Sequence, residues 1–191
     1  MTESAPIRGA DCDWTSQVLR FWFEELEAKA WFIKSEATDT RIRRRFSQLP
    51  ADLCAIAPEM LVGSAKDALA AVLALDQFPR NLHRGSSEAF ACDHQALAVA
   101  QRTIALGFDR LLRRDERLFL YLPFEHCEDA GMQARSVELI GRLGNPGWHQ
   151  YAVAHKLIVD RFGRFPHRNA ALGRPSTAEE LAFLQTPGSS F

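Results

Sequence analysis

Residues 64–81 read SAKDALAAVLALDQFPRN, and their pattern shows how this chain folds. Ser64 and Asp67 indicate the start of a helix, because serine caps a first turn and an acid there suits the helix dipole. Apolar residues then recur at the spacing of one helical face, at positions 65, 68, 69, 72 and 73. Pro79 lacks a backbone N–H, so we expect the helix to end there. Asp76 falls near that end, on the buried face.

The same spacing recurs along the rest of the chain, and alanine and leucine far outnumber valine and isoleucine. Both features favour helix over strand. Helices are expected around residues 15–26, 38–48, 64–78, 88–106, 118–122, 128–143, 148–162 and 176–185, with Gly107 and Gly163 as helix stops. We therefore predict an all-α fold of about eight helices in antiparallel pairs. A single helical domain would span residues 13–191 after a flexible tail over residues 1–12.

Composition excludes several classes of protein. The chain has 191 residues, of which 47% are hydrophobic and 25% charged, as in a soluble globular domain. Its net charge of -1 argues against a nucleic-acid or membrane-surface partner, and its longest apolar run, residues 68–75, is too short to span a bilayer. No export signal follows Met1, and the four cysteines (12, 54, 92 and 127) form no C-x-x-C pair. We expect a cytoplasmic protein with free thiols.

Three polar segments interrupt the helical pattern. The first is DQFPRN (76–81), where a buried Asp76 needs a cation, with Arg80 as the nearest candidate and Asn81 beside it. The second is FEHCED (124–129), where Glu125 and His126 follow the most apolar run of the chain. A glutamate beside a histidine suits proton transfer or metal ligation. The simpler interpretation is the acidic first turn of the next helix, which accounts for Glu128 and Asp129 better than for His126.

The third segment is RFGRFPHRN (161–169), in which basic residues alternate with aromatic ones. Aromatic anchors would aim Arg164, His167 and Arg168, with Asn169, toward a phosphate or carboxylate. The alternative is an ordered loop whose arginines pair with acids elsewhere in the chain. His155 lies on an apolar helix face and is expected to be a hydrogen-bonded core residue. No spacing of histidines and acids indicates a metal site, and the basic stripe of residues 110, 113, 114 and 117 is interrupted by acids, as in a solvated face.

The chain resembles a bacterial family of unknown function, domain-of-unknown-function family 924, from about Val18 to Phe191. The resemblance rests on LRFWF (19–23), WF (31–32), LDQFPRN (75–81), RG (84–85), AFA (89–91) with Asp93, FLYLPFEH (119–126) and RFGRFPHRN (161–169). Cys127 departs from the serine expected after Glu125 and His126, which counts against a role that needs a hydroxyl there. The resemblance implies a tetratricopeptide-like α-α superhelix. It implies no reaction, cofactor or partner.

The leading hypothesis is a concave pocket for a small anionic molecule. Asp76, Arg80, Asn81, Arg164, Arg168 and Asn169 would bind the ligand, and Glu125, His126 and His167 would move protons. The cofactor is unknown and no metal is expected. One alternative is a tetratricopeptide-like scaffold for a protein partner. In that case the polar motifs would form a structural salt-bridge network.

Overall fold

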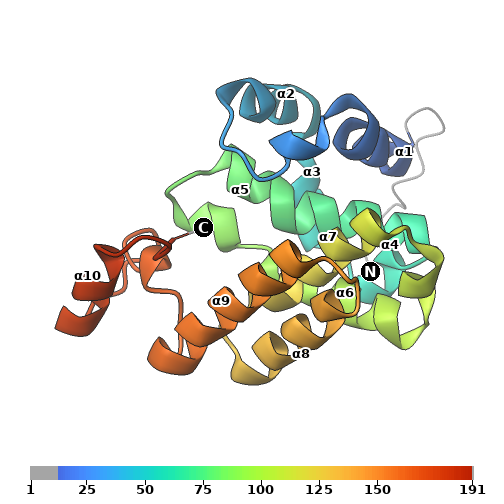
Figure 1. Ribbon diagram of the computed structural model, residues 1–191. Coiled ribbons are helices and arrows are strands. Elements are labelled where there is room, and N and C mark those ends of the chain that lie inside the picture. The colour runs from blue at the N-terminus through green and yellow to red at the C-terminus, as the bar shows by residue number, and fades with distance from the viewer. Residues whose placement is uncertain (1–12, 191) are drawn as a thin grey trace, which may run out of the picture.

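The computed structural model describes residues 13–190, and helices form most of it (Figure 1). The predicted all-α class is confirmed. The described part of the chain has no strand, and eight of its helices have seven residues or more. No helix within residues 13–190 is long and apolar enough to cross a membrane. The predicted tail, residues 1–12 with Cys12, lies outside the described residues.

The α-helices are α1 (Trp14–Arg20), α2 (Glu36–Phe46), α3 (Leu49–Cys54), α4 (Ala65–Val72), α5 (Phe78–Leu82), α6 (Asp93–Ala105), α7 (Arg114–Glu125), α8 (Ala130–Gly141), α9 (Pro146–Phe162) and α10 (Ala178–Leu184). Two π-helical segments, η1 (Phe21–Glu25) and η4 (Leu73–Gln77), continue α1 and α4. The 3-10 turns are η2 (Ala28–Ala30), η3 (Pro58–Leu61), η5 (Ser87–Phe90), η6 (Phe108–Leu111) and η7 (Pro166–Arg168).

The helices stack in tiers. Helices α1 and α2 lie at one end, α4, α6 and α7 in the middle, and the antiparallel pair α8 and α9 at the other end (Figure 1). One continuous apolar core runs through these tiers, and η4 is buried in it over its whole length. A second, small cluster of Ile158, Val159 and Phe165 holds the C-terminal segment against α9. The segments that carry the polar motifs therefore meet where the middle tier borders the C-terminal segment.

Several predicted helix boundaries are confirmed. Ser64 Oγ accepts a hydrogen bond from Asp67 N at 3.1 Å and caps α4, and Asp129 caps α8 in the same way through Met132 N at 2.9 Å. Gly107 and Gly163 end their helices with φ values of 72° and 68°, a conformation in which other residues are strained.

Other boundaries were predicted wrongly, and proline is the main reason. The helix does not end at Pro79, because η4 changes the hydrogen-bond register and places this proline in the first turn of α5, where no N–H is needed. Pro123 lies inside α7, whose apolar residues from Leu118 to Phe124 are all buried, so packing outweighs the lost hydrogen bond. The helix expected from Glu88 begins only at Asp93, after the turn η5.

Phe119 is the centre of an aromatic group that joins the N-terminal segment to α7. Its ring centroid lies 5.1 to 5.7 Å from those of Trp22, Phe23 and Trp31 in edge-to-face arrangements, and the side chain is fully buried. Phe32 stacks on Phe119 at 5.9 Å from outside and remains 60% exposed. Phe119 therefore belongs to the core, whereas Phe32 lies on the surface and packs over it.

This difference predicts unequal costs of truncation. Phe119→Ala is expected to lower the free energy of unfolding by about 3–5 kcal/mol through the cavity it leaves, and Phe32→Ala by about 1 kcal/mol or less. Urea unfolding of both variants measures the two losses. Equal losses would contradict this description of the core.

Candidate functional site

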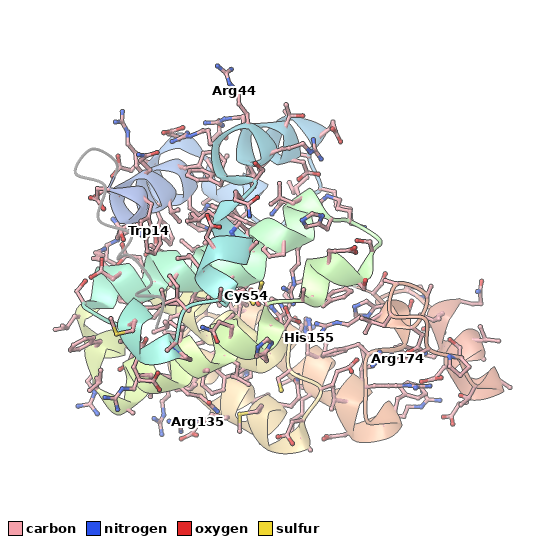
Figure 2. All side chains as sticks on the ribbon, turned by 180° about the vertical axis from the view of Figure 1, so that it is seen from behind. Trp14, Arg44, Cys54, Arg135, His155 and Arg174 are labelled. Carbon is pink, nitrogen blue, oxygen red and sulfur yellow. The ribbon has the colours of Figure 1, made fainter. Side chains whose placement is uncertain are left out.

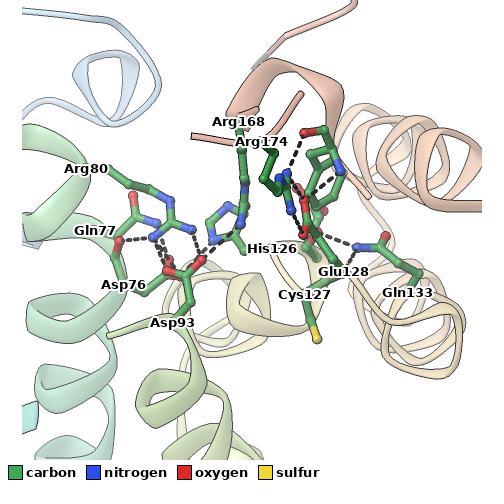
Figure 3. Close-up of polar contacts among 12 residues, drawn as sticks. Asp76, Gln77, Arg80, Asp93, His126, Cys127, Glu128, Gln133, Arg168 and Arg174 are labelled. Atoms are coloured by element: carbon green, nitrogen blue, oxygen red, sulfur yellow. Dashed lines mark hydrogen bonds and ion pairs between the residues drawn. The ribbon is translucent and has the colours of Figure 1, made fainter. Parts of the chain in front are cut away.

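Two arginines from distant parts of the chain, the half-buried Arg80 and the buried Arg168, share one carboxylate. Arg80 of α5 donates to both oxygens of Asp93 at 2.8 and 2.9 Å, and Arg168 of η7 donates to Asp93 Oδ2 at 3.1 Å (Figure 3). Asp93 is the first residue of α6, a position that an acid favours because of the helix dipole. This carboxylate ties α5, α6 and the C-terminal segment together.

Aromatic rings set the position of Arg168. Its guanidinium carbon lies 4.6 Å from the centroid of the Phe90 ring and 4.8 Å from that of Phe165. The second ring comes from the predicted aromatic anchors of the RFGRFPHRN segment. Stacking of this kind suits the flat guanidinium and leaves its edge to bind anions.

Arg168 has fewer hydrogen bonds than its donors allow. Its side chain is only 8% exposed, and its buried Nε has no hydrogen-bond partner. Burial and the nearby charge of Arg80 both lower the pKa of Arg168 from its usual value. A buried cation with an unsatisfied donor is costly, because neither water nor a protein acceptor compensates the donor.

Asp76 and His126 form a buried pair beside the two arginines. Asp76 Oδ1 lies 2.7 Å from His126 Nδ1 and 3.4 Å from Arg80 Nη1, and Gln77 Nε2 donates to Asp76 Oδ2 at 2.6 Å. Burial alone would raise the pKa of Asp76, but the charge of Arg80 and these hydrogen bonds outweigh it and hold that pKa below its usual range. Asp76 is therefore ionised and accepts the Nδ1 proton of His126.

The hydrogen bond to Asp76 fixes the orientation of the His126 ring. Its pKa is lowered, first by burial and then by the charge of Arg80, against the opposing effect of Asp76. At neutral pH the imidazole is uncharged, and the bond to Asp76 leaves Nε2 as the basic nitrogen. Asp93, the two arginines, Asp76 and His126 are called the Asp93 cluster below.

Glu125 precedes His126 and is kept neutral by its surroundings. Burial, and next the negative charge of Asp76, raise its pKa to about 8. One carboxyl oxygen lies 3.4 Å from Nδ1 of His155, a nitrogen that also lies 2.9 Å from the backbone oxygen of Tyr151. His155 is buried in the interior (Figure 2), and burial lowers its pKa to about 3, so it does not supply a charge to Glu125. The prediction of His155 as a hydrogen-bonded core residue agrees with this placement.

The predicted site residues divide into two groups. Asp76, Arg80, His126 and Arg168 meet in the Asp93 cluster, and Glu125 adjoins it. His167 is half-buried beside Arg168, and burial followed by the charge of Arg168 lowers its pKa to about 4.

The other three predicted residues support neighbouring loops instead. Arg164 binds both oxygens of Glu180 in α10 at 2.6 and 2.9 Å. Asn169 donates to Ser176 Oγ at 3.0 Å, and Asn81 donates to the Gln77 backbone oxygen at 2.9 Å. These contacts close turns and lie outside the Asp93 cluster.

A second carboxylate fixes the C-terminal loop. Glu128 accepts hydrogen bonds from Arg174 at 2.6 and 2.9 Å and from the Phe165 backbone nitrogen at 2.7 Å (Figure 3). The acidic first turn of α8 predicted from Glu128 and Asp129 is correct for Asp129 only, which is the N-cap. An ordered loop whose arginines pair with acids was the alternative for the RFGRFPHRN segment. Arg164 pairs with Glu180 in this way, and Glu128 binds the Phe165 backbone nitrogen.

The comparisons with known proteins agree on a family. The family described as "Bacterial protein of unknown function (DUF924)" matches residues 18–188. The chain belongs to the DUF924 family. Among solved structures, the DUF924 chain is similar to a protein of unknown function, ATU0120, from Agrobacterium tumefaciens. The identity is 37%, the TM-score is 0.84, and the match covers 90% of this chain and 96% of that one. No curated protein matches the chain.

Sequence analysis of the DUF924 chain missed Asp93 as a site residue. Asp93 falls inside the helix expected over residues 88–106, where an acid is ordinary, and its partners Arg80 and Arg168 are 13 and 75 residues away in sequence. Its place two residues after the AFA motif was the available signal. Within residues 13–190, no group of three or more His, Cys, Asp or Glu side chains could hold a metal ion.

The shared carboxylate predicts a large effect of its removal. Asp93→Asn leaves the buried guanidinium of Arg168 without its hydrogen-bonded anion, whereas Arg80 keeps Asp76 at 3.4 Å, and we expect a loss of about 3–5 kcal/mol in unfolding free energy. Glu138→Gln is the matched control, since Glu138 also binds two arginines, 135 and 142, but is 43% exposed. Its loss should be about 1 kcal/mol or less. Urea unfolding compares the two, and similar values would refute the claim that burial sets the strength of the Asp93 cluster.

Glu125 predicts a pH dependence of stability. A carboxyl whose pKa is raised in the folded state binds its proton more tightly there, so its contribution to the unfolding free energy falls as pH rises through about 8. The buried histidines have lowered pKa values and act below about 6.5, the unperturbed pKa of histidine, so the interval from there to about 8 isolates Glu125. In this interval wild type should lose up to about 1.4 kcal/mol per pH unit relative to Glu125→Gln. Parallel pH profiles of the two proteins would contradict the raised pKa.

Proposed function

We propose that this protein binds a small anionic molecule at the Asp93 cluster and transfers protons to and from it. The observation that carries the proposal is Arg168, a buried guanidinium stacked between two rings with an unsatisfied Nε. A ligand carboxylate or phosphate would bind to that edge by charge-assisted hydrogen bonds. Asp93, which is 20% exposed, occupies the position of such an anion and would share or yield Arg168 on binding.

Two neighbouring groups have the protonation states that acid–base chemistry needs. The neutral ring of His126, oriented through Nδ1 by Asp76, offers Nε2 to accept a proton from the ligand. Glu125 is protonated at neutral pH because its pKa lies at about 8, and it can donate a proton. The two groups are adjacent in the chain at the end of α7, so one bound ligand could contact both.

A packed ion network has no need of this arrangement. A purely structural salt bridge is most stable when each donor has an acceptor, yet Arg168 Nε has none. A purely structural ion pair of Asp76 likewise gains no stability from the neutral carboxyl group of Glu125 beside it. These two features support a ligand site over the alternative of a tetratricopeptide-like scaffold whose polar motifs serve only the fold.

The test is a thermal-shift screen of small carboxylates and phosphate esters on wild type, Arg168→Gln and Arg164→Gln. A ligand at 100 times its Kd should stabilise wild type by about 2.7 kcal/mol, or roughly 5–10 °C in Tm for a chain of this size. The shift should vanish in folded Arg168→Gln and persist in Arg164→Gln, whose guanidinium binds Glu180 instead.

Turnover then separates binding from chemistry. With a compound found in this way, His126→Gln should retain the shift and lose product formation. If no compound shifts wild type while Arg168→Gln melts much lower, the network is structural and a protein partner should be sought by pull-down.

A further inference from the structure

A basic hollow lies at the far end of α6 from the Asp93 cluster. It has a volume of about 120 Å³ and is lined by four arginines: Arg110 from η6, Arg117 from α7, Arg135 from α8 and Arg142 directly after α8. Ile104 of α6 also lines it. Ile104 and Asp93 are eleven residues apart on one helix, which separates them by about 17 Å. The hollow is therefore distinct from the site described above.

The acids near this basic hollow do not neutralise it. Glu138 binds Arg135 and Arg142. Asp109 accepts a hydrogen bond from the hydroxyl of Tyr121 at 2.7 Å instead of pairing with an arginine. Within residues 13–190, Arg110 and Arg117 have no carboxylate within 4.0 Å, the limit for an ion pair. Two positive charges thus face the hollow in excess of its acids.

Arg117 is held in place without being neutralised. Its Nε and Nη2 both lie 3.3 Å from Tyr121 Oη, and the buried Tyr121 is fixed in turn by Asp109. A fixed guanidinium with an uncompensated charge binds a phosphate with less loss of side-chain freedom than a mobile one. The volume of the hollow suits one tetrahedral anion and no large ligand.

An apolar groove continues from the basic hollow between α6 and α8. It has a volume of about 440 Å³ and shares Ile104 and Arg135 with the hollow. Its other lining residues are mostly apolar or small: Gln101, Ala105, Phe124, Gly131 and Met132. A ligand that fills both spaces would have a charged end and an apolar end.

We propose that the basic hollow binds the phosphate group of a phosphate monoester and that the apolar groove takes its ester substituent. The two charges without acid partners face the phosphate, and Ile104 and Arg135 mark the point where the ester oxygen would lie. This site is independent of the proposed acid–base function, because none of its residues belongs to the Asp93 cluster.

The test uses inorganic phosphate and phenyl phosphate in calorimetric titrations of the full chain. Arg117→Gln is expected to weaken both by about tenfold or more, as loss of a charge-assisted hydrogen bond does. Arg110→Gln, at an exposed arginine whose side chain makes no hydrogen bond within the described residues, should act in the same direction without affecting the fold. The matched control is Arg44→Gln, an exposed arginine on α2 that points away from the molecule (Figure 2) and should leave both affinities unchanged.

Two further variants assign the groove and separate the sites. Ala105→Gln, on the exposed wall of the groove, should abolish the tighter binding of phenyl phosphate over phosphate and leave phosphate itself unchanged. Arg168→Gln should leave intact the binding that Arg117→Gln weakens, and it should remove only binding at the Asp93 cluster. The proposal is overturned if neither probe binds at about 10 mM, or if Arg44→Gln weakens binding as much as Arg117→Gln. It is also overturned if phenyl phosphate binds no better than phosphate, or if only Arg168→Gln abolishes binding.

Discussion

One buried and one half-buried positive charge must be neutralised, and a single carboxylate contributes to both. Asp93 accepts hydrogen bonds from Arg80 of α5 and from Arg168 of the C-terminal segment, which lies 75 positions further along the chain. Since an uncompensated charge in the interior is more costly than most packing defects, this contact fixes where the C-terminal segment lies. The aromatic rings around Arg168 and the bond from Glu128 to the Phe165 nitrogen then have a defined place to form.

The protonation states of the titratable groups beside Asp93 follow from how deeply each group is buried and from the charges next to it. Asp76 stays ionised because a guanidinium and two hydrogen-bond donors face it, whereas Glu125, close to it in space but without such partners, holds its proton. Burial raises the pKa of Glu125, and the negative charge of Asp76 raises it further. His126 lies between a cation and an anion whose effects oppose each other, and burial decides that it is neutral. Unequal protonation of similar groups is the property that acid–base sites share.

Local signals in the sequence predicted the helices well where caps and stops decide them. Ser64, Asp129, Gly107 and Gly163 act through their own backbone neighbours, so their roles can be inferred without a fold. Pro79 and Pro123 were misjudged because tertiary packing overrides a single missing hydrogen bond. The site was predicted in part, since buried polar residues stand out from an apolar pattern. Asp93 did not stand out, because it falls inside the helix expected over residues 88–106. Arg164 cannot be distinguished from Arg168 until the fold separates them.

The π-helical segment Leu73–Gln77 also constrains the length of the chain. A π-turn holds one residue more than an α-turn, and each residue rotates an α-helix by about 100°. The segment therefore sets the angular phase between α4, which packs in the core, and α5, which carries Arg80. Because the wider turn absorbs one residue, α4 and α5 keep the relative phase that brings Arg80 to Asp93. One residue inserted or deleted in the regular turns of α4 or α5 would instead rotate Arg80 by about 100° relative to the core face of α4.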